Sequence, residues 1–435
     1  MNEDAACLDD VIAWAWDGPP RGSATEAQAR RLLLDSLGCA LAGLRHPRVS
    51  AFGAALAGPF PGVLRLPGVK AGLAPGGAAA LLAAAMPWDE ANEGLARAHG
   101  RPGLPVAPLA LAALAGGTTL GEAVAAYALG YEVSARAGEV WRIRPGMHVD
   151  GSWHALGAAA AAARLAGLDV AGAARAVRLV ACQIPFSLYA PIAAGLDGRN
   201  SYPAHAALLG LTAASAAAAG MDAPGDGFAV ARRIALGAEE PPQRAPTGAW
   251  LLEEAYVKPF AGVRHAHYGA AAALALRPAL DGRLDRIEAI RLETYAEAIA
   301  YASNRAPASA IKAQFSLSWA IAAALAQGDL GPTAYADAAL ADPLLRRLEA
   351  LVELAEDKGM TAAGRRAARL VVEVDGTRLS EAVDGVAGDP DRPMDDDAVR
   401  AKFLRLAGAE AAPVAAALLG APHAARVAVF DACER

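Results

Sequence analysis

Apolar residues recur at helical spacing through most of the first 235 residues of the chain. The predicted helices are rich in alanine, the strongest helix former, and short turns separate them. Thr25 is the expected cap of the first helix, and Thr119 with Glu122 forms a capping-box pattern before another. We therefore expect closely packed helices in this region. They cover residues 29–44, 75–86, 108–115, 123–137, 157–165, 170–182 and 205–219.

The pattern changes near residue 284. Residues 286–295 alternate between apolar and polar side chains, which predicts a strand with one buried face. Residues 369–375 form a second predicted strand, and Asp375 with Gly376 is a strong hairpin-turn signal. A helix over 315–326 lies between the strands, and helical spacing returns over 395–406 and 411–419.

This order predicts a mainly α protein. Both chain ends form a large all-helical domain, and a smaller α+β domain is inserted between the two pieces. We place the first helical piece at residues 1–266, the α+β domain at 267–394 and the second helical piece at 395–435.

Composition and charge exclude several classes of protein. The formal net charge of −6, with 40 basic residues spread along the chain, provides no basic face for nucleic acid. No apolar stretch reaches the length of a membrane span, and the acidic residues 1–4 do not resemble a signal peptide. We therefore expect a cytoplasmic protein without nucleic-acid or membrane partners. The four cysteines, which are too far apart to predict a disulfide framework or a metal site, are Cys7, Cys39, Cys182 and Cys433.

Three polar segments interrupt the apolar or turn-rich background, at residues 88–103, 197–205 and 258–267. Clefts between domains are favoured ligand sites, so we expect these segments to line one. Arg and Lys pair with carboxylates, and His moves protons near neutral pH. Such a set can move a proton on the carbon beside a carboxylate without a cofactor. A single Arg or His in a loop is more often just solvated, and for the pair His265 and His267 no nearby carboxylate or cysteine completes a metal site.

Several segments resemble, in order, motifs of the MmgE/PrpD family, which includes 2-methylcitrate dehydratase, cis-aconitate decarboxylase and iminodisuccinate epimerase. The resemblance runs over nearly the whole chain. The residues that carry it are 34–43, 101–108 (Arg-Pro-Gly-Leu-Pro-Val-Ala-Pro), 130–133 (Gly-Tyr-Glu-Val), 146–169, 258–267 (Lys-Pro-Phe-Ala-Gly-Val-Arg-His-Ala-His), 314–317 (Gln-Phe-Ser-Leu), 389–394 and 402–403.

The resemblance implies a helical domain with a smaller α+β lid domain, a homodimer, no cofactor, and an active site between the two domains. It implies a small anionic carboxylate as the substrate. The catalytic residues that follow are His99, His267, Arg101, Arg199 and Asp89. The substrate-binding residues that follow are Lys258, His148, Arg264, His265 and Tyr202.

The chain departs from the family pattern at positions that matter for chemistry. Arg101 stands where the family has a motif histidine, with His99 two residues earlier, and Arg199 aligns with the family's active-site lysine. Asp150 replaces a threonine, and Trp319 replaces a tyrosine. Because Arg stays protonated, we expect Arg101 and Arg199 to clamp carboxylates or stabilise an oxyanion. Either a histidine, His99 or His267, then moves the proton, or the chemistry has drifted from the better-known reactions of the family. The altered set indicates a substrate unlike methylcitrate.

Three functions remain open at this stage. The first is a cofactor-independent lyase, either a dehydratase or a decarboxylase, that acts on a small di- or tricarboxylate. The second is an isomerase or epimerase that removes the same proton and returns it on another face. The third is a family member that has lost its catalytic base, since a fold alone does not determine a function.

Overall fold

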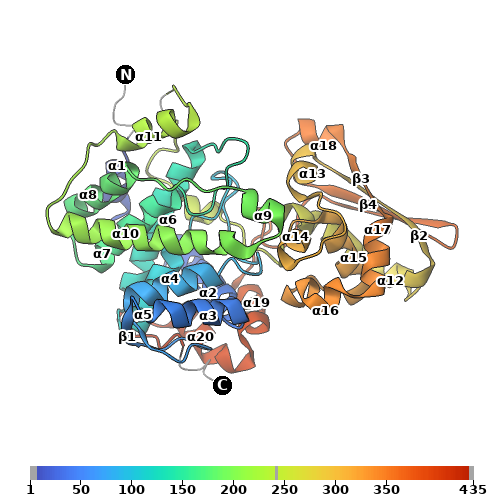
Figure 1. Cartoon of the computed structure of the whole chain (residues 1–435), viewed down its shortest axis with the longest axis horizontal. Coiled ribbons are helices and arrows are strands. Elements are labelled where there is room, and N and C mark those ends of the chain that lie inside the picture. Colours follow the sequence, from blue (N-terminus) through green and yellow to red (C-terminus); the bar gives the residue numbers. More distant parts are fainter. Residues whose placement is uncertain (1–6, 241–242, 431–435) are drawn as a thin grey trace.

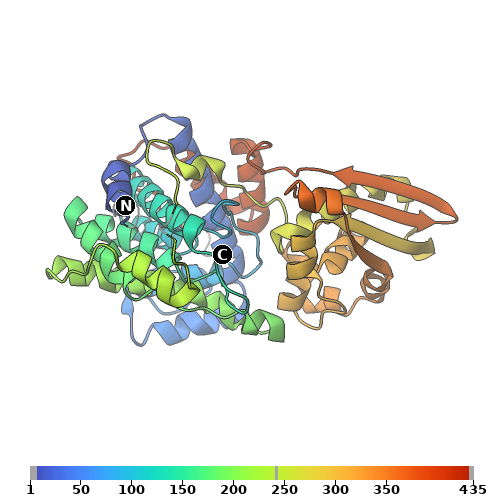
Figure 2. The same cartoon turned by 90° about the horizontal axis from the view of Figure 1, so that it is seen from above.

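The computed structural model describes residues 7–240 and 243–430, and it is mainly α-helical with one small mixed sheet (Figure 1). Helices from both chain ends gather on one side, which we call the helical part (Figures 1 and 2). The sheet and its helices, residues 267–383, lie on the other side and form the sheet part. The predicted mainly α class is confirmed, whereas the domain boundaries that we place from the sequence stay a prediction.

The helices and short strand of the helical part are α1 (Asp9–Ala15), α2 (Ala24–Leu44), α3 (Pro47–Leu56), β1 (Pro61–Leu64), α4 (Pro75–Ala85), α5 (Val106–Ala115), α6 (Leu120–Val140), α7 (His154–Leu165), α8 (Val170–Ala181), α9 (Ala190–Ala194), α10 (Tyr202–Ala218), α11 (Gly227–Leu236), α19 (Asp396–Ala407) and α20 (Ala412–Gly420). Short 3₁₀ helices in and beside this part are η2 (Asp197–Ser201), η3 (Leu251–Glu254), η4 (Arg264–Ala266) and η7 (Ala409–Ala411).

The sheet part contains α12 (His267–Leu280), η5 (Leu284–Arg286), β2 (Ile287–Thr294), α13 (Ala296–Ala302), α14 (Ala310–Gln314), α15 (Leu317–Gln327), η6 (Pro332–Tyr335), α16 (Asp337–Leu340), α17 (Pro343–Leu351), β3 (Val352–Glu356), α18 (Lys358–Ala362), β4 (Ala368–Val374) and β5 (Thr377–Val383). The strand order is β3-β2-β4-β5. Strand β2 is parallel to β3 and antiparallel to β4, while β4 and β5 form the hairpin that the turn signal predicts.

Local sequence explains where two of the long helices begin. The side chain of Thr119 accepts a hydrogen bond from the backbone N–H of Glu122 at 3.4 Å, as predicted for the start of α6. Helix α2 starts earlier than expected, because Ser23 accepts from the backbone N–H of Glu26 at 3.1 Å. The prediction of Thr25 as the cap is wrong, since its hydroxyl donates to Glu253 instead.

Two glycines allow α6 and α7 to pack closely beside the loop that precedes α7. A Cβ atom on Gly157 would lie 2.1 Å from the carbonyl oxygen of Gly130, which no side chain tolerates. This contact anchors the start of α7 against α6 and so holds the loop 141–153 in place. That loop carries two residues of the site described below, His148 and Asp150.

The last helices return to the helical part, where α19 packs against α2. Phe403 of α19 closes onto Gly38 of α2, and Lys402 forms a buried ion pair with Asp35. Buried residues of the first segment, beginning at Leu8, and of the last segment, ending at Phe430, therefore belong to one hydrophobic core. No helix among the described residues is both long and apolar enough to span a bilayer. Cys7, Cys39 and Cys182 are free thiols, whereas Cys433 and the acidic residues 1–4 lie outside the described residues.

Candidate active site

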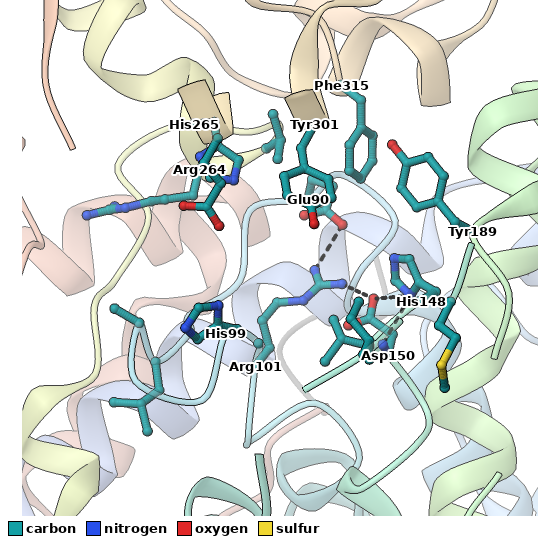
Figure 3. A pocket seen from close by; sticks show the side chains of 18 of the residues that line it. Glu90, His99, Arg101, His148, Asp150, Tyr189, Arg264, His265, Tyr301 and Phe315 are labelled. Carbon is teal, nitrogen blue, oxygen red and sulfur yellow. Dashed lines mark hydrogen bonds and ion pairs between the residues drawn. The ribbon is translucent and has the colours of Figure 1, made fainter. Parts of the chain in front are cut away.

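A cavity of about 290 Å³ lies where the helical part, the segment 256–265 and the sheet part meet. Its polar lining comes from segments that are far apart in the sequence (Figure 3). The lining side chains that carry charge or an imidazole are Glu90, His99, Arg101, Arg142, His148, Asp150, Lys258, Arg264, His265, Glu297 and Arg366. The predicted convergence of separate segments on one crevice is therefore observed for part of the candidate set.

Six of the ten candidate residues line this cavity: His99, Arg101, His148, Lys258, Arg264 and His265. The other four do not, and their placement corrects the expectation that they meet a ligand directly. His267 and Arg199 are fully buried behind the cavity wall. Asp89 lies 3.4 Å from His46, and the hydroxyl of Tyr202 donates to the carbonyl of Leu188 at 3.2 Å.

Arg101 is fixed between two carboxylates at the centre of the cavity (Figure 3). Its guanidinium contacts Oε1 of Glu90 at 3.0 Å, forms an ion pair with Asp150, and donates to Oδ1 of Asn92 at 2.9 Å. The negative charges raise the pKa of Arg101 further above its ordinary value, despite its burial. Three acceptors leave part of its five N–H donors free for a ligand.

Arg199 contacts the same two carboxylates from the buried side, away from the cavity. It forms ion pairs with Glu90 and, at 3.2 Å, with Oδ2 of Asp150, and it donates to the carbonyl of Pro87 at 3.3 Å. Because its side chain is fully buried and faces these residues, Arg199 holds the carboxylates that hold Arg101. The sequence predicted that Arg199 clamps a carboxylate of the ligand, and this buried position does not support that role.

Lys258 completes the buried ionic cluster, which we define as Glu90, Arg101, Asp150, Arg199 and Lys258. Its ammonium lies 2.9 Å from Oε2 of Glu90, and it also donates to the carbonyls of Glu90 at 2.7 Å and Gly262 at 3.3 Å. Three acceptors match its three N–H donors, so Lys258 fixes the segment that carries Glu90. Burial lowers the pKa of Lys258 to about 8, while the charge of Glu90 opposes that shift.

The charges of the cluster control the two carboxyl groups. Burial alone raises the pKa of a carboxyl group, but the guanidinium and ammonium groups around Glu90 hold its pKa well below the ordinary range. Arg101 and its neighbours likewise keep the pKa of Asp150 low. Both are carboxylates at neutral pH, and the cluster carries three positive and two negative charges.

Two residues of the loop 86–105 have left-handed backbone conformations. Glu90 has φ of 54° and His99 has φ of 49°, values that are uncommon for residues with side chains. Such strain costs about 1–3 kcal/mol per residue and collects at functional sites, where the surrounding structure holds it in place. Here the ion pairs of Glu90 with Arg101, Arg199 and Lys258 supply that hold.

His148 lies on the loop before α7, and its protonation state follows from its contacts. The backbone N–H of Asp150 donates to Nδ1 of His148 at 3.0 Å, so the neutral ring carries its hydrogen on Nε2. Burial lowers the pKa of His148 to about 4, which keeps the ring neutral at pH 7. His148 is therefore a hydrogen-bond donor toward the cavity and not a base.

His265 and His99 are the other two imidazoles of the cavity. Nδ1 of His265 and the hydroxyl of Tyr295 lie 2.6 Å apart, a contact that orients the ring. Burial lowers the pKa of His265 to about 3. His99 is exposed at the edge of the cavity, and partial burial together with Arg142 lowers its pKa below the ordinary value. Both rings are neutral at pH 7, but a pKa of about 3 keeps His265 from taking up a proton there, so His99 is the ring suited to accept one.

His267, by contrast, is a structural residue at the first position of α12. Its Nε2 lies 3.2 Å from the carbonyl oxygen of Gly262, and its ring packs edge-on against Phe260 with centroids 5.4 Å apart. The carbonyl contact places the hydrogen of the neutral ring on Nε2, and the accepting nitrogen, Nδ1, is fully buried without a hydrogen-bond partner among the described residues. A general-base role for His267 is not supported by this placement.

Sequence reasoning missed several residues of the cavity. Glu90 lies in the polar segment 88–103 and Asp150 in the matched segment 146–169, but neither was chosen. The signal that could have identified them is the need of a buried Arg101 for carboxylate partners. Arg142, Glu297, Tyr301 and Arg366 carry no motif, so only the tertiary fold brings them here. Among the described residues, no group of three or more His, Cys, Asp or Glu side chains is arranged to hold a metal ion.

Comparison with protein families divides the chain into two matched regions, one N-terminal and one C-terminal. The MmgE/PrpD N-terminal domain matches residues 16–236, and the MmgE/PrpD C-terminal domain matches residues 260–417. A comparison with curated proteins found no significant match. The two matches cover most of the chain, and the order of motifs in the sequence agrees with them. The chain therefore belongs to the MmgE/PrpD family, whose members are in general enzymes with dehydratase-type activity.

Proposed function

We propose that this protein is a lyase that moves a proton on the carbon next to a carboxylate of a small organic acid, using its own side chains. The observation that carries the proposal is that His99 and Arg101 line the same cavity. This arrangement sets a neutral imidazole beside a guanidinium that still has free donors. Family membership supports lyase chemistry, and the site supports an anionic substrate.

In the proposed reaction, Arg101 binds the substrate carboxylate through its free N–H donors. His99 then takes the proton from the adjacent carbon. The electron pair of the broken C–H bond moves toward the carboxylate, where the Nε2–H of His148 and the charge of Arg101 stabilise the negative oxygen. The carbanion expels a hydroxyl from the next carbon as a double bond forms. That hydroxyl receives the proton from protonated His99 and leaves as water.

Decarboxylation is the other lyase reaction that the site supports. Loss of carbon dioxide leaves an electron pair on carbon, and a protonated imidazole returns one proton there. Both reactions need one proton-transfer group and a fixed carboxylate binder. They place the same demand on Arg101, but elimination starts from neutral His99, whereas decarboxylation starts from His99 that has first taken a proton from water.

An isomerase is the second candidate, because His265 lines the cavity together with His99 and His148. His99 comes from the helical part, and His265 comes from the segment that enters the sheet part. If one ring removes a proton and the other returns it on the opposite face, the carbon is inverted and nothing leaves. The position of this second ring favours an epimerase, whereas its pKa of about 3 disfavours the protonated form that would return the proton.

The experiment is an incubation in deuterated water with hydroxylated tricarboxylates, dicarboxylates and iminodicarboxylates, followed by NMR. An unsaturated product, or carbon dioxide release, supports the lyase. Deuterium incorporation without net loss supports the isomerase. His99→Gln should abolish either signal, and His205→Gln, an exposed histidine of α10, is the matched control. Absence of turnover and of exchange with every class overturns the enzyme proposal in favour of an inactive family member.

We also propose that the sheet part is a lid domain over the cavity, with boundaries at residues 267 and 394, and that the protein is a homodimer in solution. The lid is supported by Glu297, Tyr301 and Arg366, which reach the cavity from the sheet part. The dimer rests on family resemblance. Light scattering of the purified protein tests the dimer, and limited proteolysis near the two boundaries tests the domains.

A further inference from the structure

Two arginines of the cavity, Arg142 and Arg366, have no carboxylate partner among the described residues. The other cations of the lining are each paired, since Arg101 and Lys258 contact Glu90 and Arg264 forms an ion pair with Asp389. Arg142 makes one hydrogen bond, to the backbone carbonyl of Arg97 at 3.3 Å. Both guanidinium groups therefore bring unused donors to the cavity.

The two arginines reach the cavity from opposite parts of the molecule. Arg142 follows α6 of the helical part, and Arg366 precedes β4 of the sheet part. Both positive charges act on His99, while the charges that act on His148 are those of Asp150, Arg199, Arg101 and Glu90. His99 and His148 lie on opposite sides of Arg101 (Figure 3). The cavity thus has an inner end at His148 and an outer end at His99.

The outer end carries a net positive charge. Glu297, in the first turn of α13, also lines the cavity, but it forms no ion pair with either arginine. Two positive charges and one negative charge leave a surplus of one positive charge. Unpaired guanidinium groups that face a cavity from two sides are suited to bind a carboxylate, which accepts several N–H donors at once.

We propose that Arg142 and Arg366 form a second carboxylate subsite at the outer end of the cavity. With the first carboxylate of the substrate on Arg101, which rests on the proposed function, this subsite selects acids that carry a carboxylate at each end. Arg142 and Arg366 are then the residues that select for the second carboxylate of a di- or tricarboxylate, and monocarboxylates of equal length bind poorly. Because the two arginines come from different parts of the chain, the second carboxylate also joins those parts.

The test is isothermal titration calorimetry with succinate, glutarate and citrate, and with butyrate as the monocarboxylate probe. We expect Arg142→Gln and Arg366→Gln each to weaken binding of the best polycarboxylate about tenfold, the effect of about 1.4 kcal/mol, and to leave butyrate binding unchanged. The matched controls are Arg144→Gln and Arg365→Gln. They remove one positive charge from the same two loops at exposed positions outside the cavity.

Two results overturn the subsite. One is a wild-type protein that binds all three polycarboxylates no better than butyrate, and the other is unchanged polycarboxylate binding in both variants. Circular dichroism of each variant verifies folding, which we expect to survive because neither arginine is in an ion pair. Succinate, glutarate and butyrate carry no hydroxyl group to eliminate, so their binding is measured without dehydration and the two proposals fail separately. One further outcome separates the two proposals. If polycarboxylate binding depends on both arginines but no proton exchange occurs in deuterated water, the subsite is supported and the proposed lyase activity is contradicted.

Discussion

The backbone N–H of Asp150 donates a hydrogen bond of 3.0 Å to Nδ1 of His148, and this contact determines what the imidazole can do. With Nδ1 occupied as an acceptor, the neutral ring presents an N–H group to the cavity. Protonation would place a hydrogen on Nδ1 against the same N–H. This conflict agrees with a pKa for His148 of about 4, for which burial is the largest cause.

We therefore expect His148→Phe to lower kcat by about a hundredfold, the scale for loss of one donor to a developing negative oxygen. His148→Gln retains an N–H donor and should keep more activity. Neither variant should move the acidic limb of the pH profile, because a group with a pKa of about 4 does not titrate there. Measurement of kcat and kcat/KM between pH 5 and 9 checks this. Loss of the acidic limb in His148→Phe would identify His148 as the base instead.

The pH profile should report His99. A base works in its neutral form, so activity is full above the pKa of His99 and falls as the pH drops through it. Partial burial and the positive charge of Arg142 lower that pKa, which places the limb below about pH 6.5. Arg142→Gln removes a positive charge and should move the limb to higher pH. Glu297→Gln removes a negative charge and should move it to lower pH.

These two shifts have opposite signs, which separates an effect on His99 from a general loss of activity. Arg144→Gln, an exposed arginine of the same loop as Arg142, should leave the limb where it is. Steady-state rates at saturating and at low substrate concentration supply the profiles. A limb that stays fixed in both cavity variants would exclude His99 as the base.

Helical periodicity and turn chemistry predicted most of the fold, because these signals are local. Thr119 caps α6, and the turn at Asp375 and Gly376, with φ of 48° and 69°, joins β4 to β5 as expected. Strand β3 was missed, because its five residues follow α17 directly and pair in parallel with β2, and parallel pairing depends on contacts distant in sequence.

The site was predicted only in part for the same reason. Motifs identified Arg101, His148 and Lys258, which do line the cavity. Motifs cannot distinguish a residue that faces the cavity from one that supports it from behind, and so Arg199 and His267 were expected at the ligand. Burial made the difference, since both side chains are fully enclosed. Arg366 carries no motif, and only the packing of β4 against β2 brings its loop to the site.

Arg199 should matter for stability more than for substrate affinity. Arg199→Ala leaves Glu90 and Asp150 buried with one cation fewer, and breaking such a buried pair costs about 3–5 kcal/mol. Arg199→Lys retains the charge but loses the forked geometry, so the loss should be smaller. Guanidinium denaturation gives the free energy of unfolding. A midpoint equal to that of the wild type in Arg199→Ala would contradict the supporting role.

Glu93 provides a test of the buried polar layer behind the cavity. Its Oε1 accepts from the backbone N–H of Gly103 at 3.1 Å, and its Oε2 lies 3.2 Å from the hydroxyl of Tyr131. Its own backbone N–H donates to Asp35 at 3.0 Å. Burial, followed by the negative charge of Asp35, raises the pKa of Glu93 to about 8. In the folded protein at neutral pH, Glu93 is therefore mostly a neutral acid.

The sign of the pH effect follows from this raised pKa. Below about pH 4.5 Glu93 is protonated in both states, and its contribution to stability is fully present. Between about pH 4.5 and 8 the folded state binds a proton that the unfolded state lacks, so the free energy of unfolding falls as the pH rises. Above about pH 8 Glu93 is ionised in both states, so its contribution to the free energy of unfolding is lost and no longer changes with pH.

Glu93→Gln replaces the neutral acid with an amide of similar shape that does not titrate. We expect the variant to match the wild type at pH 5 and to exceed it in stability at pH 8.5, with a difference that grows between these values. Urea denaturation of both proteins at pH 5, 7 and 8.5 measures it, and all other titrating groups cancel in the comparison. Glu239→Gln, at an exposed glutamate, should show no such trend. If the difference between Glu93→Gln and the wild type is the same at all three pH values, Glu93 is ionised in the folded protein, and the layer beneath Arg101 carries one more negative charge than we infer.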